Sequence, residues 1–178
     1  VEREKILNKK IKNNDLILAI PSNGLHSNGF SLVRFIIKKK KIKLKTNKFL
    51  KSELIRPTKI YVNELSNINE KSLINGCANI TGGGLKDNIQ RVIPKNLGAE
   101  INLDKIKTLK IFKWLNKMGI SETEMLKTFN CGVGFCLIIN PKNLETVSGY
   151  FGKKFKPYVI GKINKNSKKI KLSGKVSW

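Results

Sequence analysis

The sequence is poor in the residues that usually build metal and thiol sites. It has one histidine, His26, and three cysteines that form no CxxC pair. Zinc sites need several Cys or His ligands at recurring spacings, so we predict no zinc site. We expect the thiols of Cys77, Cys131 and Cys136 to be buried and reduced, as in a cytoplasmic protein.

Acidic residues are also scarce. Asp and Glu number 12 against 36 Lys and Arg, and they form no DxD or ExxE cluster. Enzymes that use nucleoside triphosphates normally hold Mg²⁺ with carboxylates, so we predict no metal ligand within this chain. Glu124 follows Ser121 at capping-box spacing, and we interpret this pair as the start of a helix.

The formal net charge of +24 raises the possibility of a nucleic-acid partner. Two observations weaken it. Only four of the basic residues are Arg, and the few aromatic residues rarely lie between lysines. Lys, Ile and Asn are also encoded by A/T-rich codons, so mutational bias alone can produce this composition. A basic nucleic-acid-binding module therefore remains the alternative from another functional class.

No apolar run approaches the roughly 20 residues that cross a bilayer, so no membrane partner is expected. The chain has 178 residues, 40% of them hydrophobic, which suits one folded domain with its own core. It opens on Val1 in a charged segment without an apolar signal core. We expect such a chain to be part of a longer protein.

Short apolar runs alternate with amphipathic stretches along the whole chain, which predicts an α+β fold with a layered sheet and no internal domain boundary. Strands are expected at 15–20, before 81, and at 98–103, 131–140, 158–163 and 169–174. Helices are expected at 31–40, 56–68, 85–94, 109–119, 121–129 and 141–152, with residues 38–49 as a solvated helix end and loop.

One arrangement occurs twice: an apolar strand, a glycine-rich loop and a helix. The loops are "PSNGLHSNG" (21–29) and "TGGG" (81–84). Glycine lets the backbone approach a ligand, and the first amides of a helix lack internal acceptors, so such a loop can bind phosphate. Neither loop matches the GxxxxGK[ST] or GxGxxG pattern, and a tight turn with a helix cap is the alternative. The predicted phosphate- or substrate-binding residues are Ser27, Asn28, Gly29, Ser31, Thr81, Gly82, Gly83 and Gly84.

His26 lies among polar and glycine residues in the first of these loops. An imidazole there can polarise a bound oxygen or move a proton near neutral pH. A lone histidine is more often a structural hydrogen-bonding group, and no neighbouring carboxylate orients this one. We nevertheless take His26 as the candidate catalytic residue and favour ligand contact over general-base chemistry.

Several long motifs in order resemble a known family: "SNGLHSNGFSLVR", "RPTKIYVNEL", "ITGGGLKDNIQRVIP", "IFKWLNKMG", "EMLKTFNCGVGF" and "YVIGKI". They are similar to the C-terminal half of the phosphoribosylformylglycinamidine cyclo-ligases (AIR synthetases). The resemblance covers nearly the whole chain and implies one α/β/α domain with a mixed sheet over residues 1–178. Residues 1–14 would then be the connector from an N-terminal ATP-binding domain.

The resemblance implies a reaction of purine synthesis. ATP phosphorylates the formyl amide oxygen of formylglycinamidine ribonucleotide, and the amidine nitrogen then closes the imidazole ring. The products are aminoimidazole ribonucleotide, ADP and phosphate. In this family the N-terminal domain supplies most of the ATP and Mg²⁺ site and the homodimer contact, so we expect this domain to be inactive by itself. Another ATP-dependent synthase of the same superfamily is the alternative within this class.

Two further positions come from the same resemblance. The family usually has His before a stretch made of a hydrophobic residue and Thr-Gly-Gly-Gly, and this chain has Asn79 at that position. An asparagine can hydrogen-bond but cannot titrate, so proton transfer at this position is in doubt. Asn130, in the "FNCGVGF" motif, is the second possible site residue.

Overall fold

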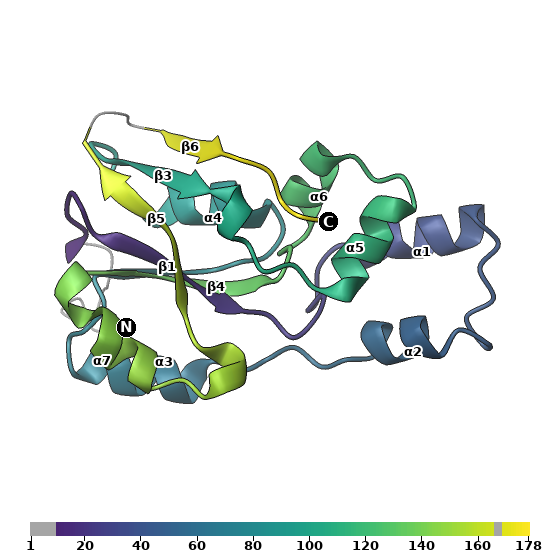
Figure 1. Cartoon of the computed structure of the whole chain (residues 1–178), viewed down its shortest axis with the longest axis horizontal. Coiled ribbons are helices and arrows are strands. Elements are labelled where there is room, and N and C mark those ends of the chain that lie inside the picture. Colours follow the sequence, from purple (N-terminus) through teal and green to yellow (C-terminus); the bar gives the residue numbers. More distant parts are fainter. Residues whose placement is uncertain (1–9, 166–168) are drawn as a thin grey trace.

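A six-stranded mixed sheet forms the centre of the molecule (Figure 1), in a computed structural model that describes residues 10–165 and 169–178. The strands lie in the order β2-β4-β1-β5-β3-β6, and only β3 and β6 pair in parallel. They are β1 (Leu16–Pro21), β2 (Gly76–Asn79), β3 (Gly98–Asn102), β4 (Val133–Ile139), β5 (Tyr158–Asn164) and β6 (Ile170–Ser173).

Helices cover both faces of this sheet, which confirms the three-layer α/β/α prediction. From β1, Leu18 and Ile20 pack into the apolar cluster that includes α3 (Val62–Glu70) and α7 (Leu144–Gly149). Residues 17 and 19 point to the opposite face, into the cluster that includes α4 (Gly84–Val92). Because β1 is buried on both faces, its sequence is a continuous apolar run instead of an alternating one.

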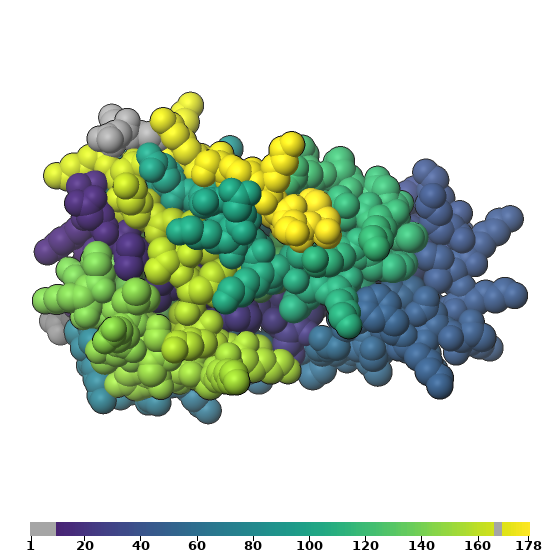
Figure 2. Space-filling view, viewed as in Figure 1, coloured from purple at the N-terminus to yellow at the C-terminus, as the bar shows by residue number. Residues whose placement is uncertain are grey.

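A third apolar cluster lies at one end of the sheet, where the chain projects from the body (Figures 1 and 2). Phe112 and Phe129 are fully buried there, with their ring centroids 6.0 Å apart. The helices of this end are α1 (Phe30–Lys39), α2 (Lys48–Leu54), α5 (Lys110–Lys117) and α6 (Glu122–Thr128). As predicted, the Ser121 hydroxyl accepts a hydrogen bond from the Glu124 amide at the start of α6.

The predictions for residues 38–68 were partly wrong. Helix α2 was not predicted, because its lysines continue the charged run that was interpreted as a solvated loop. Asn47 caps this short helix, and its side chain accepts a hydrogen bond from the Leu50 amide. The helix predicted for 56–68 begins only at Val62, since residues 56–61 are held in a non-helical conformation by the loop that follows β1.

Two smaller expectations were wrong in part. The helix predicted for 141–152 is a 3₁₀ turn, Pro141–Asn143, followed by α7. Cys131 and Cys136 are buried as expected, but Cys77 is partly exposed on the edge strand β2.

Most of the connector predicted for residues 1–14 lies outside the described residues. Within the described ranges, no helix combines the length and apolar character needed to span a membrane.

Candidate ligand-binding site

Both predicted strand–loop–helix units are present, and their loops meet. The first loop (residues 22–29) joins β1 to α1, and the second loop (residues 80–83) joins β2 to α4. Each ends in a left-handed glycine that precedes the helix, Gly29 with φ 77° and Gly83 with φ 95°. The side-chain oxygen of Asn28 accepts a hydrogen bond from the Gly82 amide at 3.2 Å. Residues 54 positions apart therefore form one surface.

The first loop presents free backbone donors. The amides of Phe30, Ser31 and Leu32 have no acceptor among the described residues, and Val33 is the first whose amide bonds back to the chain, to the Gly29 carbonyl. The ten-residue helix α1 has no acidic residue in its first turn, and the Ser31 side chain is exposed beside it. Unpaired amides at the positive end of a helix can bind an anion.

In the second loop and the residue after it, the amides of Gly82, Gly83 and Gly84 are already engaged, whereas those of Leu85 and Lys86 in the first turn of α4 have no acceptor among the described residues. The Gly83 amide donates to the Lys127 carbonyl at 2.9 Å, and the Gly84 amide donates to the Thr81 carbonyl at 3.1 Å. A buried asparagine on α4, Asn88, donates to the carbonyls of residues 81, 82 and 84 and accepts from the Thr81 hydroxyl. A ligand can therefore reach the Gly82 amide only by replacing the Asn28 oxygen.

His26 is held in a strained, buried position at the centre of the first loop. Its φ is 57°, a left-handed conformation that L residues seldom adopt, and the residue is only 7% exposed. The ring lies against Gly134 of β4, where a Cβ would overlap it, and beside the ring of Tyr61. Burial lowers the pKa of the His26 imidazole, so the ring is neutral at pH 7.

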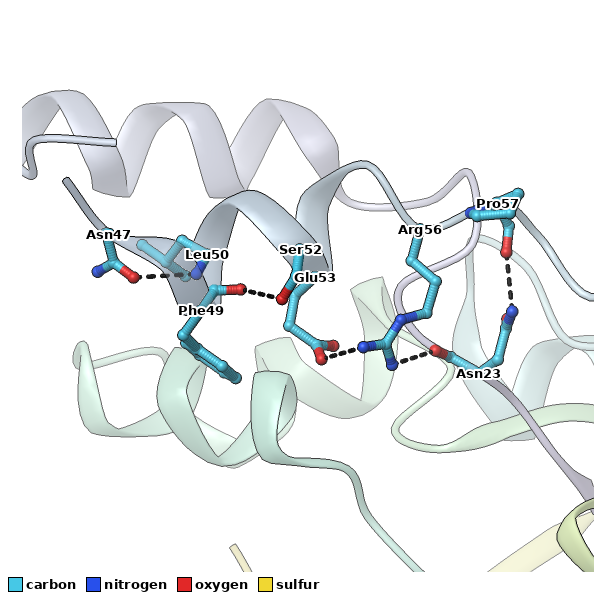
Figure 3. A network of polar contacts seen from close by, with 8 residues as sticks. All are labelled: Asn23, Asn47, Phe49, Leu50, Ser52, Glu53, Arg56 and Pro57. Carbon is cyan, nitrogen blue, oxygen red and sulfur yellow. Dashed lines mark hydrogen bonds and ion pairs between the residues drawn. The ribbon is translucent and has the colours of Figure 1, made fainter. Parts of the chain in front are cut away.

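Asn23 connects His26 to a segment far along the chain. Its side-chain oxygen lies 2.9 Å from Nε2 of His26 and also accepts from the Lys59 amide at 3.2 Å. Its side-chain nitrogen donates to the Pro57 carbonyl, and its own carbonyl accepts from Nη1 of Arg56 (Figure 3). Arg56 in turn pairs with the nearly buried Glu53 of α2 at 2.5 Å. The first loop is thus fixed to the segment 56–61.

Two further hydroxyl contacts attach that segment to the end of β1 and to the first loop. The Tyr61 hydroxyl donates to the Pro21 carbonyl at 2.8 Å, and burial raises the pKa of this phenol. The Ser27 hydroxyl lies 3.3 Å from that of Thr58. The roles of Asn23, residues 56–61 and Asn88 were not predicted. The contacts of Asn23 with residues 56, 57 and 59 join positions more than 30 apart, which no local pattern encodes. Asn88 lies only four to seven positions from its partners, so an asparagine four residues after Gly84 was the available signal.

Asn130 and Asn79 lie in contrasting surroundings. Asn130 is fully buried, accepts from the Ser22 hydroxyl and the Gly132 amide, and donates to the carbonyls of residues 24 and 25. Its side chain therefore uses its hydrogen-bonding capacity within the protein, to fix the first loop to the turn before β4. Asn79 is exposed at the end of β2, and its side chain has no hydrogen bond to any described residue.

The described residues contain neither a cluster suited to a metal ion nor a cysteine with a lowered thiol pKa. Among the described residues, no three His, Cys, Asp or Glu side chains gather into a group that could hold a metal. Mg²⁺ prefers carboxylate oxygens, so these residues do not fit it. Burial raises the pKa of Cys131 to about 12, and it raises the pKa of the thiols of Cys77 and Cys136, which keeps all three protonated at pH 7.

The sequence and the fold match known proteins over most of the chain. Residues 12–172 match the family model described as "AIR synthase related protein, C-terminal domain". The chain belongs to this family.

Two relatives and one solved structure illustrate the match. The chain is 39% identical to the phosphoribosylformylglycinamidine cyclo-ligase of Neisseria meningitidis over 160 residues, which is 86% of this chain and 46% of that protein. It is 40% identical to the "bifunctional purine biosynthetic protein purD" of Dictyostelium discoideum over 97% of this chain and 22% of that one. PurL of T. maritima complexed with AMPPCP shares the fold, with a TM-score of 0.56 and 12% identity over 93% of this chain and 24% of that one.

The chain thus spans less than half the length of either of these relatives. Its family membership follows from the domain model, whereas the activity of the longer proteins extends beyond the part that the chain shares with them.

Proposed function

We propose that this chain is the C-terminal half of an ATP-dependent cyclo-ligase that closes the imidazole ring of formylglycinamidine ribonucleotide. The products are aminoimidazole ribonucleotide, ADP and phosphate. The family and the likeness to the cyclo-ligase of Neisseria meningitidis support the proposal at the level of sequence. ATP is the second ligand, and AMPPCP in the PurL complex is an ATP analogue bound to a protein of the same fold.

One structural observation carries the proposal: the hydrogen bond from the Gly82 amide to Asn28. It joins the second loop to the first, beside the free amides of α1. A phosphate oxygen at the start of α1 can accept from the amides of residues 30–32 and from the hydroxyl of Ser31. The same ligand lies within reach of Asn28 and the loop that holds His26.

The predicted site residues then divide into two groups. Ser27, Asn28, Gly29 and Ser31 form the binding wall, and His26 contacts the ligand from the same loop. Thr81, Gly82, Gly83 and Gly84 keep the second loop in place through their contacts with Asn88, Lys127 and Asn28. Asn130 positions the first loop, and Asn79 faces solvent at the edge of the surface.

The described residues of this chain bind and orient the substrate, and they offer no cluster of carboxylates that would hold Mg²⁺. Its ligands are expected in the additional half that the relatives carry, as is most of the ATP site. We therefore expect this chain alone to bind substrate without turning it over. A homodimer of the longer protein and a reducing, cytoplasmic location, which suits three free cysteines, remain predictions.

A binding experiment tests the proposal directly. Calorimetric titration of the chain with formylglycinamidine ribonucleotide should give saturable binding that inorganic phosphate competes away. Asn28→Ala should weaken binding about 10- to 100-fold, since a hydrogen bond to a charged group contributes about 1.5–3 kcal/mol. Asn63→Ala, at an exposed position on α3, is the matched control and should bind like the wild type.

Absence of binding to the folded chain would contradict the proposal, as would equal affinities for the Asn28 variant and the wild type. A steep loss of RNA or DNA binding with salt, at submicromolar affinity and with sequence preference, would instead favour the basic nucleic-acid-binding alternative. Product formation by a chimera that joins this chain to the N-terminal part of the Neisseria meningitidis cyclo-ligase would test the reaction itself.

A further inference from the structure

The amide group of Asn23 has only one orientation that satisfies its neighbours. The Lys59 backbone N–H can only donate, so the atom that faces it at 3.2 Å must be the side-chain oxygen. The Pro57 carbonyl can only accept, so the atom that faces it at 2.9 Å must be the side-chain nitrogen. Two backbone groups of known polarity therefore assign the oxygen and nitrogen of Asn23.

This orientation determines which nitrogen of His26 carries the proton. The Asn23 oxygen lies 2.9 Å from Nε2, and two lone pairs would repel each other at that distance, so Nε2 must be the protonated nitrogen. The Asn23 backbone N–H also points at Nε2, but at 3.4 Å, and the shorter contact decides. The neutral ring then has an unprotonated Nδ1.

Nδ1 of His26 has no hydrogen-bond partner among the described residues, yet it is not sealed inside the protein. The buried side-chain nitrogen and oxygen atoms that lack a partner in the described part are Thr108 Oγ1 and Asn164 Oδ1. Because Nδ1 is not one of them, it keeps some contact with solvent, on a residue that is only 7% exposed. A lone pair in this position can accept a hydrogen bond from a ligand.

We propose that Asn23 is a positioning residue that fixes His26 as a neutral acceptor, so that Nδ1 takes an N–H or O–H group of the ligand and not a phosphate oxygen. The part that concerns the ligand rests on the proposed function. On this proposal, two neighbouring parts of the site recognise different groups of the ligand. The amides of α1 take the anionic group, and His26 takes a donor group such as an amidine nitrogen or a sugar hydroxyl.

The single histidine makes the test unambiguous. Long-range ¹H–¹⁵N NMR of the chain with ¹⁵N-labelled histidine reports one imidazole and distinguishes its tautomers directly. At pH 7.5 we expect one species with Nε2 protonated and Nδ1 unprotonated. Asn23→Asp loses the donor to the Pro57 carbonyl but keeps an acceptor oxygen for Nε2, so Nε2 should stay protonated and the imidazole pKa should rise, whereas Asn23→Ala should give a mixture of both tautomers. Asn63→Ala, at an exposed position on α3, is the control and should match the wild type.

An Nδ1-protonated ring in the wild type would overturn the proposal, and so would an unchanged tautomer in a folded Asn23→Ala variant. Should Asn23→Ala fail to fold, the wild type and Asn23→Asp still decide between the two tautomers.

NMR titration also tests the part of the proposal that concerns the ligand. Formylglycinamidine ribonucleotide should shift the Nδ1 resonance, and inorganic phosphate should shift the amides of residues 30–32 but not Nδ1. If the nucleotide shifts those amides and leaves Nδ1 unchanged, the acceptor role is wrong and the proposed function stands. If the nucleotide binds nowhere, the proposed function fails even where the tautomer is as expected.

Discussion

The two glycine-rich loops start from the same plan, a strand followed by a turn and a helix, but they are stabilised in different ways. The second loop is held largely by one nearby residue: Asn88, four positions beyond Gly84, donates to the carbonyls of residues 81, 82 and 84, and the Gly83 amide donates to the Lys127 carbonyl of α6. The first loop is held from a distance, by Asn130 and by residues 56–61. This difference is the reason why the proposed function gives the second loop a supporting role and the first loop the recognition groups.

The largest effect should come from the close approach of the second loop to α6. Gly84→Ala should lower the free energy of unfolding by about 3–4 kcal/mol, because a Cβ at φ 64° would overlap the Leu126 carbonyl. Gly82→Ala is the matched control: no heavy atom lies within 4 Å of a Cβ there, and we expect a change within about 0.5 kcal/mol. Urea denaturation measures both. Equal losses would show that the second loop is not a tightly packed support.

Asn130→Ala should have the next largest effect, about 3 kcal/mol. The substitution leaves the buried Ser22 hydroxyl and the carbonyls of residues 24 and 25 without partners, and each such group costs about 1–3 kcal/mol before relaxation. Asn79→Ala, at an exposed position, should change stability by less than about 0.5 kcal/mol. A near-neutral Asn130→Ala would mean that the first loop does not depend on this distant anchor.

Loss of the α2 contact should have a smaller effect. Arg56→Ala removes the donor to the Asn23 carbonyl and the partner of Glu53, and should cost about 1 kcal/mol because the arginine is 37% exposed. It should also broaden the NMR signals of the first loop while leaving those of the second loop sharp. Arg34→Ala, an exposed arginine on α1, is the control. Broadening of the signals of both loops would contradict the view that different contacts stabilise the two loops.

The smallest effect concerns pH. Because folding lowers the pKa of His26, the unfolded chain binds a proton first when the pH falls below about 6.5, which is the ordinary value. The stability contributed by the neutral ring is therefore present above pH 6.5 and is lost as the pH falls toward the folded pKa. The loss is at most about 1.4 kcal/mol per pH unit.

His26→Asn should flatten this part of the stability profile, and asparagine tolerates the left-handed backbone at that position. Denaturation between pH 7.5 and 5.5 measures the effect, in a range above most carboxylate titrations. An identical slope in the variant would show that another group is responsible.

The sequence predicts the layers well because apolar periodicity is a local property. The continuous apolar run of β1 predicts burial on both faces, and "TGGG" before an amphipathic stretch predicts the turn into α4. It does not predict that residues 56–61 run beside the first loop, since Pro57 equally favours a helix start. Contacts over 30 or more residues decide that region, as the bond between Asn23 and Pro57 shows.

The candidate site, like the fold, is predictable only where local sequence determines it. His26, Asn28 and the glycines follow from the loop pattern. The anchoring of Asn130 and the orientation of Asn23 do not, because each depends on which backbone groups the fold brings to the amide.

The most direct test of the account is an NMR titration of the ¹⁵N-labelled chain with formylglycinamidine ribonucleotide. If the two loops form one binding surface, the amide signals of residues 30–32 and of Gly82 should shift together and saturate with a single Kd. Shifts confined to the second loop, or saturable shifts only on the far helices α3 and α7, would contradict the account.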